Sequence, residues 1–178
     1  MFITSADEGL RTFLSSRLPL SGDAGEVSFD APTPEWSAGL THPTVNLFLY
    51  RVEKSDQLAR APQRRFDANG RPERRNASTL MVDLTYLVSV WAQDAAVEHD
   101  LLGRVVSLFM ATPTLPAHST AGAGGSMLVS FGFGDQAAPG LLAAAGPLKA
   151  FAAVTLTAAT DDVTADESVP AAGAVAAP

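Results

Sequence analysis

Glu98, His99 and Asp100 form an acid–histidine–acid run of the residue types that carry general acid–base chemistry. The surrounding residues predict a helix, and adjacent helix positions point about 100° apart, so the three side chains cannot meet at one substrate atom. Glu98 falls within the apolar arc of that helix, His99 at its edge and Asp100 on the opposite side. We therefore interpret Glu98 as a structural anchor, bonded to backbone amides or to a nearby arginine. Acid–base catalysis is the alternative.

Other reactive groups have no supporting pattern. The three histidines, His42, His99 and His118, form no pair at metal-binding helical spacing, and without cysteine there is no thiolate chemistry or cysteine-ligated zinc. The AGAGGS run at residues 121–126 lacks the lysine of a phosphate-binding loop, and there is no G-x-S-x-G elbow. The sequence predicts no catalytic residue, no metal, no cofactor and no enzymatic activity.

An arginine-rich loop is the strongest candidate for a binding function. Residues 54–79 join two segments that strongly predict strands, and this connection is far longer than is common between strands. Half of the twelve basic residues lie within its stretch 60–75: Arg60, Arg64, Arg65, Arg71, Arg74 and Arg75. One interpretation is a solvated arm that keeps the protein soluble. A second is an arm that docks onto an acidic protein, since guanidinium forks suit carboxylates. Nucleic acid is a third, with Phe66 as the one stacking ring nearby.

Two long apolar runs predict the main strands that must position these residues. Residues 44–53 are apolar on both faces, which is typical of a central strand covered on both sides. Residues 80–91 are long for a strand, and we expect such a strand to extend beyond its own sheet and to serve a neighbour.

Two amphipathic helices are predicted beside the strands. The first covers residues 5–19, with Ser5 and Glu8 at the spacing of a capping box. The second covers residues 95–110, with Asp94 as its N-cap. Gly103 lies away from the apolar side of the second helix, which indicates either close approach of another backbone or simple tolerance.

The order of elements predicts one α/β domain of the α+β type over residues 1–160. We expect a mixed, largely antiparallel sheet flanked by helices. The remaining elements are a short strand at 26–32, a strand at 127–133, a short helix at 139–146 and a strand at 149–160. Residues 161–178 have no aromatic residue and no usable period, and we predict a disordered tail.

Composition restricts the class of partner. Of the 178 residues 47% are hydrophobic and 17% charged, and the low share of charge favours a subunit that hides surface against other subunits. The net charge of −7 argues against general binding to nucleic acid or acidic membranes. No secretory signal or membrane span is visible, so we expect the chain to stay in the cytoplasm unless a larger particle carries it out.

Four segments in order resemble a known family. They are the N-terminal amphipathic helix, HPTVNLFLYRV at 42–52, LMVDLTYLVSVWA at 80–92 and EHDLLGRVVSLF at 98–109. Together they are similar to the cap, or tail-terminator, proteins of phage-tail-like contractile injection systems, over roughly residues 1–112. After Pro113 the sequence departs from the family pattern.

The resemblance implies a structural protein with a tail-terminator-like fold. Such caps form a ring, usually a hexamer, that ends the inner tube and holds the last layer of the contractile sheath. The implied partners are therefore copies of the chain itself, the tube protein and the sheath protein, with no membrane partner. Because sheath layers interlock by exchanging strands, pairing at a sheet edge is an expected mode of contact. The alternative is an adaptor whose basic arm binds nucleic acid or another acidic partner.

Overall fold

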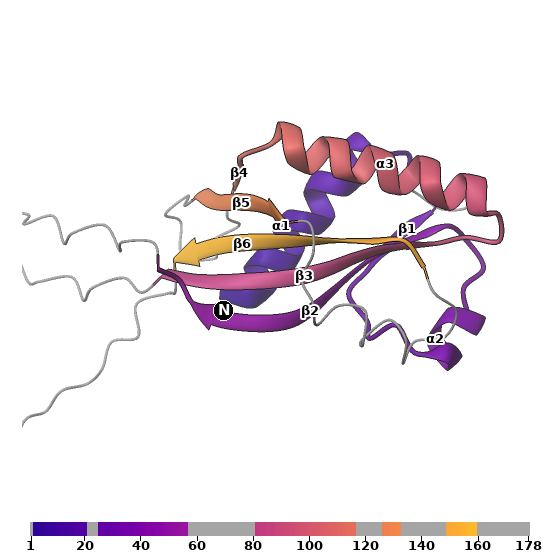
Figure 1. Ribbon diagram of the computed structural model, residues 1–178, viewed down its shortest axis with the longest axis horizontal. Coiled ribbons are helices and arrows are strands. Elements are labelled where there is room, and N and C mark those ends of the chain that lie inside the picture. Colours follow the sequence, from indigo (N-terminus) through magenta and orange to yellow (C-terminus); the bar gives the residue numbers. More distant parts are fainter. Residues whose placement is uncertain (1, 21–24, 57–80, 117–125, 133–148, 160–178) are drawn as a thin grey trace, which may run out of the picture.

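The computed structural model describes residues 2–20, 25–56, 81–116, 126–132 and 149–159 of the chain. Six strands form one sheet in the order β1-β2-β3-β6-β5-β4 (Figure 1). The pair β1–β2 is parallel and the other neighbouring pairs are antiparallel. The elements are α1 (Phe2–Arg17), β1 (Glu26–Ser28), α2 (Pro34–Ala38), β2 (Thr44–Lys54), β3 (Met81–Trp91), α3 (Ala95–Ala111), β4 (Thr114–Pro116), β5 (Ser126–Gly132) and β6 (Phe151–Ala159). The expected mixed, largely antiparallel α+β fold is confirmed.

β3 is the centre of the sheet. It pairs with β2 from Val82 to Trp91 and with β6 from Met81 to Ser89. The expectation that this strand extends beyond its own sheet is therefore wrong, because its two neighbours are nearly as long as it is. β2 instead extends well beyond its neighbour β1, because β1 pairs with it only at Thr44–Asn46.

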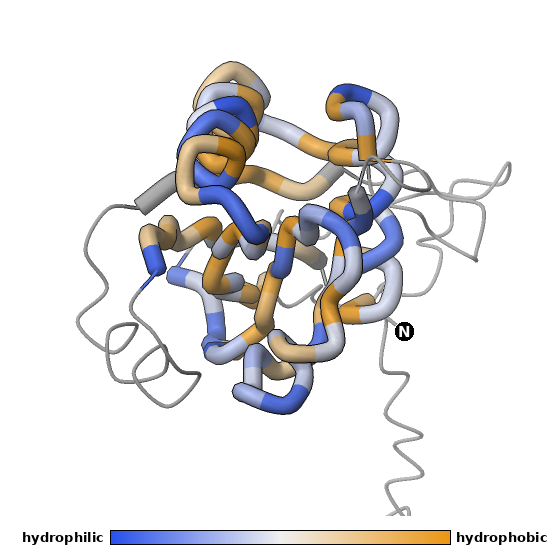
Figure 2. The backbone as a smooth tube through the Cα atoms, turned by 90° about the vertical axis from the view of Figure 1, so that its right-hand side faces the viewer, coloured by the Kyte–Doolittle hydropathy of each residue, from blue (hydrophilic) through white to orange (hydrophobic). Residues whose placement is uncertain are grey.

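Both long helices cover the same face of the sheet. Alternate residues of β3, among them Tyr86 and Val88, form one buried cluster with Leu10 of α1 and Val105 of α3. The ring of Phe13 in α1 lies 5.7 Å from that of Phe109 in α3, so the two helices also contact each other. Figure 1 shows α3 running along the sheet with α1 behind the strands. Viewed from the side, Figure 2 shows hydrophobic residues recurring along the helices and strands around this core.

The opposite face of the sheet carries a smaller apolar cluster and a polar region. Leu87 is fully buried there, and Phe48, Tyr50 and Phe151 pack against it. Farther along, the hydroxyl groups of Thr85 and Thr155 lie 3.2 Å apart, and Thr157 donates a hydrogen bond to Asp83. Burial in β2 falls from complete at its start to exposed at its end, where Val52 is 50% exposed. The prediction of a fully covered central strand therefore holds only for the first part of β2.

Local chemistry accounts for several element boundaries. Asp94 caps α3 as predicted, because its side chain accepts a hydrogen bond from the Ala96 amide. The first helix begins at Phe2, so Ser5 lies inside it and the capping-box prediction is wrong. The first short strand ends at Ser28, and the sequence did not predict α2 or β4. The predicted short helix at 139–146 and the predicted tail lie outside the described residues. No helix within the described residues is long and apolar enough to cross a membrane.

Candidate functional site

Glu98 lies where β3 turns into α3, and it joins three parts of the fold. Its side chain is 11% exposed, and its Oε1 accepts a hydrogen bond of 3.0 Å from the Ala92 amide. The same atom forms an ion pair with the ammonium group of Lys149, which stands just before β6. The sequence suggested backbone amides or an arginine as partners. The structure gives one amide and a lysine that lies 51 residues away along the chain.

Trp91 lies beside this ion pair, and Trp36 packs against Trp91. The Lys149 ammonium lies 5.3 Å from the centroid of the Trp91 ring, at a range where cation and ring attract each other. Trp91 donates a hydrogen bond from Nε1 to the Ser89 hydroxyl, and its ring meets Trp36 of α2 edge-on at 5.6 Å. Trp91 thereby links the end of β3, the start of β6 and α2. Sequence reasoning missed this cluster because no periodic pattern connects its three segments.

The other two members of the acidic run do not join Glu98. Asp100 is exposed and pairs with Arg104 one turn later in α3, at 2.9 Å. His99 is also exposed. The structure therefore does not bring the acid–histidine–acid run together as a reaction centre. His42 borders the pocket described next, and His118 lies outside the described residues. Within the described residues no group of three metal-binding side chains occurs.

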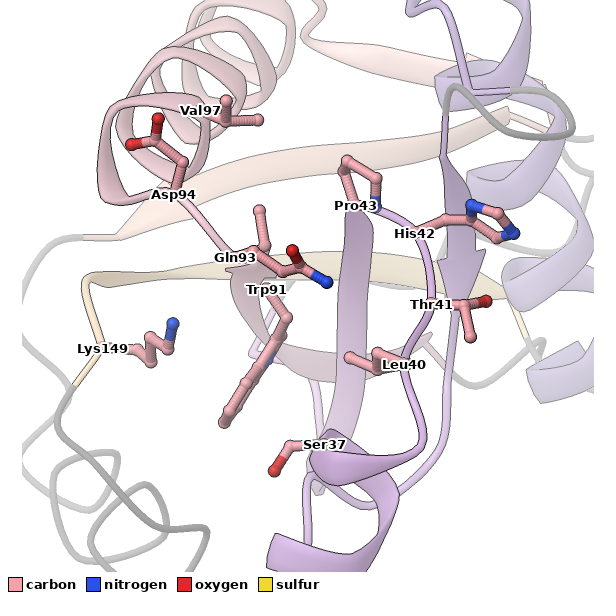
Figure 3. A pocket seen from close by; sticks show the side chains of 11 residues that line it. Ser37, Leu40, Thr41, His42, Pro43, Trp91, Gln93, Asp94, Val97 and Lys149 are labelled. Atoms are coloured by element: carbon pink, nitrogen blue, oxygen red, sulfur yellow. The ribbon is translucent and has the colours of Figure 1, made fainter.

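A pocket of about 470 Å³ lies beside Trp91 (Figure 3). It is lined by the segment Ser37–Pro43, by the turn from Trp91 to Asp94, and by Val97 and Lys149. Val97 is 42% exposed at this site. The Ser37 hydroxyl donates to the Pro34 carbonyl, and the Asp94 carboxylate caps α3. Those two side chains thus have structural uses within the fold.

Asp7 and Tyr86 form a second polar contact, partly buried, between α1 and β3. The Tyr86 hydroxyl donates a hydrogen bond of 2.8 Å to Asp7 Oδ1. Burial raises the pKa of Asp7, whereas the bond to Tyr86 and the nearby Arg11 lower it. Burial, with the bond to Asp7, raises the pKa of Tyr86 far above its ordinary value. The contact holds α1 on the sheet as long as Tyr86 keeps its proton and can donate it to Asp7.

The six arginines of the predicted arm, Arg60, Arg64, Arg65, Arg71, Arg74 and Arg75, lie outside the described residues, in the segment 57–80. The two described ends of that segment are neighbours, because Lys54 at the end of β2 pairs with Val82 at the start of β3. The arm therefore leaves and re-enters the fold at one end of the sheet. Its role in binding stays a prediction.

Comparison with known proteins gives a family and a fold. The model of the Pvc16 N-terminal domain family matches residues 5–169. A comparison with curated protein sequences gives no match.

Two solved structures share the fold. One is the PVC sheath/tube terminator of an extracellular contractile injection system in the extended state, with a TM-score of 0.60 and 16% identity over 100% of this chain. The other is the tube-terminating cap of the anti-feeding prophage, with a TM-score of 0.55 and 18% identity over 88% of this chain. The chain spans 64% and 55% of the length of those two proteins, less than two thirds of each.

Proposed function

This chain belongs to the Pvc16 N-terminal domain family, and from that premise we propose that it is a cap subunit of a contractile injection system. Copies of the chain form a ring, a hexamer, that ends the inner tube and anchors the last layer of the sheath. The observation that carries the proposal is the fold, which the chain shares with a sheath/tube terminator and with a tube-terminating cap. The work of such a subunit is contact between surfaces, with no bond made or broken.

The use of the polar residues supports a structural role. Three carboxylates that could act in acid–base catalysis each form an ion pair or a hydrogen bond with another side chain of the fold. Glu98 binds Lys149, Asp100 binds Arg104, and Asp7 binds Tyr86. Each of these contacts joins elements or holds a helix turn, which is what a rigid building block requires.

Three surfaces are available for the assembly contacts. The first is the outer end of β2 around Val52, where β1 no longer runs alongside and a strand of a sheath subunit can add to the sheet. The second is the arginine arm, which docks onto acidic tube or sheath subunits. The third is the pocket beside Trp91, which takes an apolar side chain of a partner. The protein acts within a particle that is assembled in the bacterial cytoplasm and then released.

Electron microscopy of particles from cells that lack the chain tests the proposal. Without a cap the tube has no defined end, so we expect particles of variable length, with frayed or absent sheath at one end. Restoring the chain from a plasmid should restore uniform length. Straight particles of uniform length with intact ends in the absence of the chain would refute the proposal. The nucleic-acid adaptor suggested by the basic arm gains no support from the described residues.

A further inference from the structure

A groove between α1 and α3 has a charge opposite to that of the protein as a whole. It has a volume of about 650 Å³ and lies between the last turn of α1, at Arg17, and the exposed side of α3, from His99 to Leu108. Arg17 and Arg104 both line it, with Asp100 as the one acidic residue of the lining. In a chain of net charge −7 this groove is locally cationic.

The two guanidinium groups retain capacity to bind an anion. Arg17 is exposed in the last turn of α1, and no described residue forms an ion pair with it. Arg104 uses Nε to contact Asp100, which leaves its two terminal amino groups for another carboxylate. The side chains of Arg104 and Asp100 are 59% and 66% exposed, so their pair is screened by water and opposes an incoming anion only weakly.

The floor of the groove admits a backbone at close range. A Cβ atom on Gly103 would meet nothing within 4 Å, so packing inside the chain does not explain this glycine in the middle of α3. Ser107, one turn later, turns its hydroxyl back onto the Gly103 carbonyl at 2.8 Å. Gly103 and Ser107 thus add uncharged surface without large side chains to the groove that Arg17 and Arg104 also line.

We propose that this groove binds the acidic segment Asp161–Glu167 of a neighbouring copy of the chain. The inference rests on the proposed function in one respect, namely that copies of the chain stand side by side in a ring. The segment reads DDVTADE, with four carboxylates and no cation, which complements the two arginines. Its small residues suit the low floor at Gly103. The family match also extends through residue 169, so the segment belongs to the matched domain.

The chain outside the described residues is long enough for this contact. β6 ends at Ala159, and the segment follows almost at once. Residues 160–167, which include the segment itself, span up to about 26 Å when fully extended. A domain of this size has a radius of gyration of roughly 16 Å. The segment can therefore leave the surface of its own domain and lie on that of the next subunit. Repeated around a ring, each subunit gives one segment and receives one.

Binding of a peptide tests the groove. The full-length chain is made with its own segment neutralised (Asp161→Asn, Asp162→Asn, Asp166→Asn, Glu167→Gln), and a fluorescent peptide of residues 160–170 is titrated into it. We expect saturable binding that weakens with salt and becomes about tenfold weaker with Arg17→Gln. Lys54→Gln, which removes an exposed cation outside the groove, serves as the matched control. Gly103→Leu should abolish binding, because its side chain would occupy the space in which the peptide lies. Gly103→Ala adds a single methyl group and should weaken binding less, if the loss follows from side-chain volume. Equal binding by the Arg17→Gln and Lys54→Gln variants would overturn the proposal, and so would undiminished binding by Gly103→Leu.

Sedimentation distinguishes contact between copies from contact within one copy. The neutralised chain and an Arg17→Glu chain should each lose the assembly seen for the unaltered protein, and circular dichroism checks that both are folded. Mixed together, they should form a dimer, because one supplies a sound segment and the other a sound groove. Absence of that dimer, or an unaltered protein that sediments as a monomer, would refute the contact between copies. If particles without the chain were normal while the dimer formed, the cap function would fail and this contact would stand.

Discussion

At the scale of single residues, the contact between Tyr86 and Asp7 makes the fold sensitive to alkaline pH. The folded state holds the Tyr86 proton above the ordinary tyrosine pKa of 10.0, because burial and the bond to Asp7 both raise the pKa. An unfolded chain releases that proton near pH 10, so the contribution to stability is complete below this pH and is lost as the pH rises further.

Tyr86→Phe should therefore cost about 1 kcal/mol of unfolding free energy near neutral pH, and more if Asp7 is left without a partner. Above pH 10 the deficit relative to the unaltered chain should shrink, since phenylalanine has no proton to lose. Urea unfolding at a series of pH values measures both effects. Tyr50→Phe is the matched control, because Tyr50 is the other tyrosine of the chain and is only half-buried. A deficit for Tyr86→Phe that stays constant at alkaline pH would contradict this account. The raised pKa of Asp7 acts in the acid range and leaves the comparison unaffected.

The ion pair of Glu98 and Lys149 also acts at the scale of residues. Its side chains are 11% and 19% exposed, so removing one partner leaves the other charge nearly buried. We expect Glu98→Gln or Lys149→Met to cost about 3 kcal/mol. The double variant should cost much less than the sum, because it leaves no unpaired charge. A double-mutant cycle by chemical denaturation measures this coupling. The exposed pair Asp100–Arg104 provides the comparison, with an expected coupling of about 0.4 kcal/mol. Equal coupling for the two pairs would show that Glu98 is not an anchor.

At the scale of elements, the sequence predicts what hydrophobic period determines and misses what distant contacts determine. β2, β3, β6 and α3 were predictable because long apolar runs with a period of 2 or 3.6 residues define them. β4 has three residues and α2 five, so neither is long enough to show a hydrophobic period. β4 pairs with β5, and α2 has the Thr33 cap and the contact of Trp36 with the ring of Trp91. The sequence also places Glu98 on the apolar side of α3, but it does not identify Lys149, 51 residues away, as its partner. Sequence periodicity places a residue on a face, but it does not tell which segment packs against that face.

The start of α3 offers a test of local sequence chemistry. Asp94 accepts a hydrogen bond of 2.8 Å from the Ala96 amide, and as an anion it also meets the positive end of the helix. Asp94→Ala should lower the unfolding free energy by about 1 kcal/mol, while Asp94→Asn, which keeps the acceptor, should cost only a few tenths, roughly the dipole contribution. Thermal or urea unfolding measures both variants. Equal losses for the two would assign the effect to charge instead of capping.

At the scale of the whole molecule, charge is divided between two parts. The segment 57–80 carries six arginines against Asp67 and Glu73, a net charge of +4. The other six basic and 17 acidic residues leave −11 for the rest of the chain. A cationic arm on an acidic body draws in acidic partners and disfavours nucleic acid, because the body repels phosphates that the arm attracts. Such a division suits a subunit that meets protein surfaces in a fixed orientation.

The arm should therefore determine how firmly the cap holds its partners. Replacing Arg60, Arg64, Arg65, Arg71, Arg74 and Arg75 by alanine should leave the fold intact, because both ends of the arm are fixed by the pairing of β2 with β3. We expect longer or frayed particles in electron micrographs, since the contacts between guanidinium groups and carboxylates are lost. Replacement by six lysines keeps the charge and removes the planar fork. Intermediate particles would mean that forked contacts matter, whereas normal ones would mean that charge alone is sufficient. Uniform particles with the alanine variant would remove the arm from the mechanism and leave the sheet edge, the pocket beside Trp91 and the groove as the assembly surfaces.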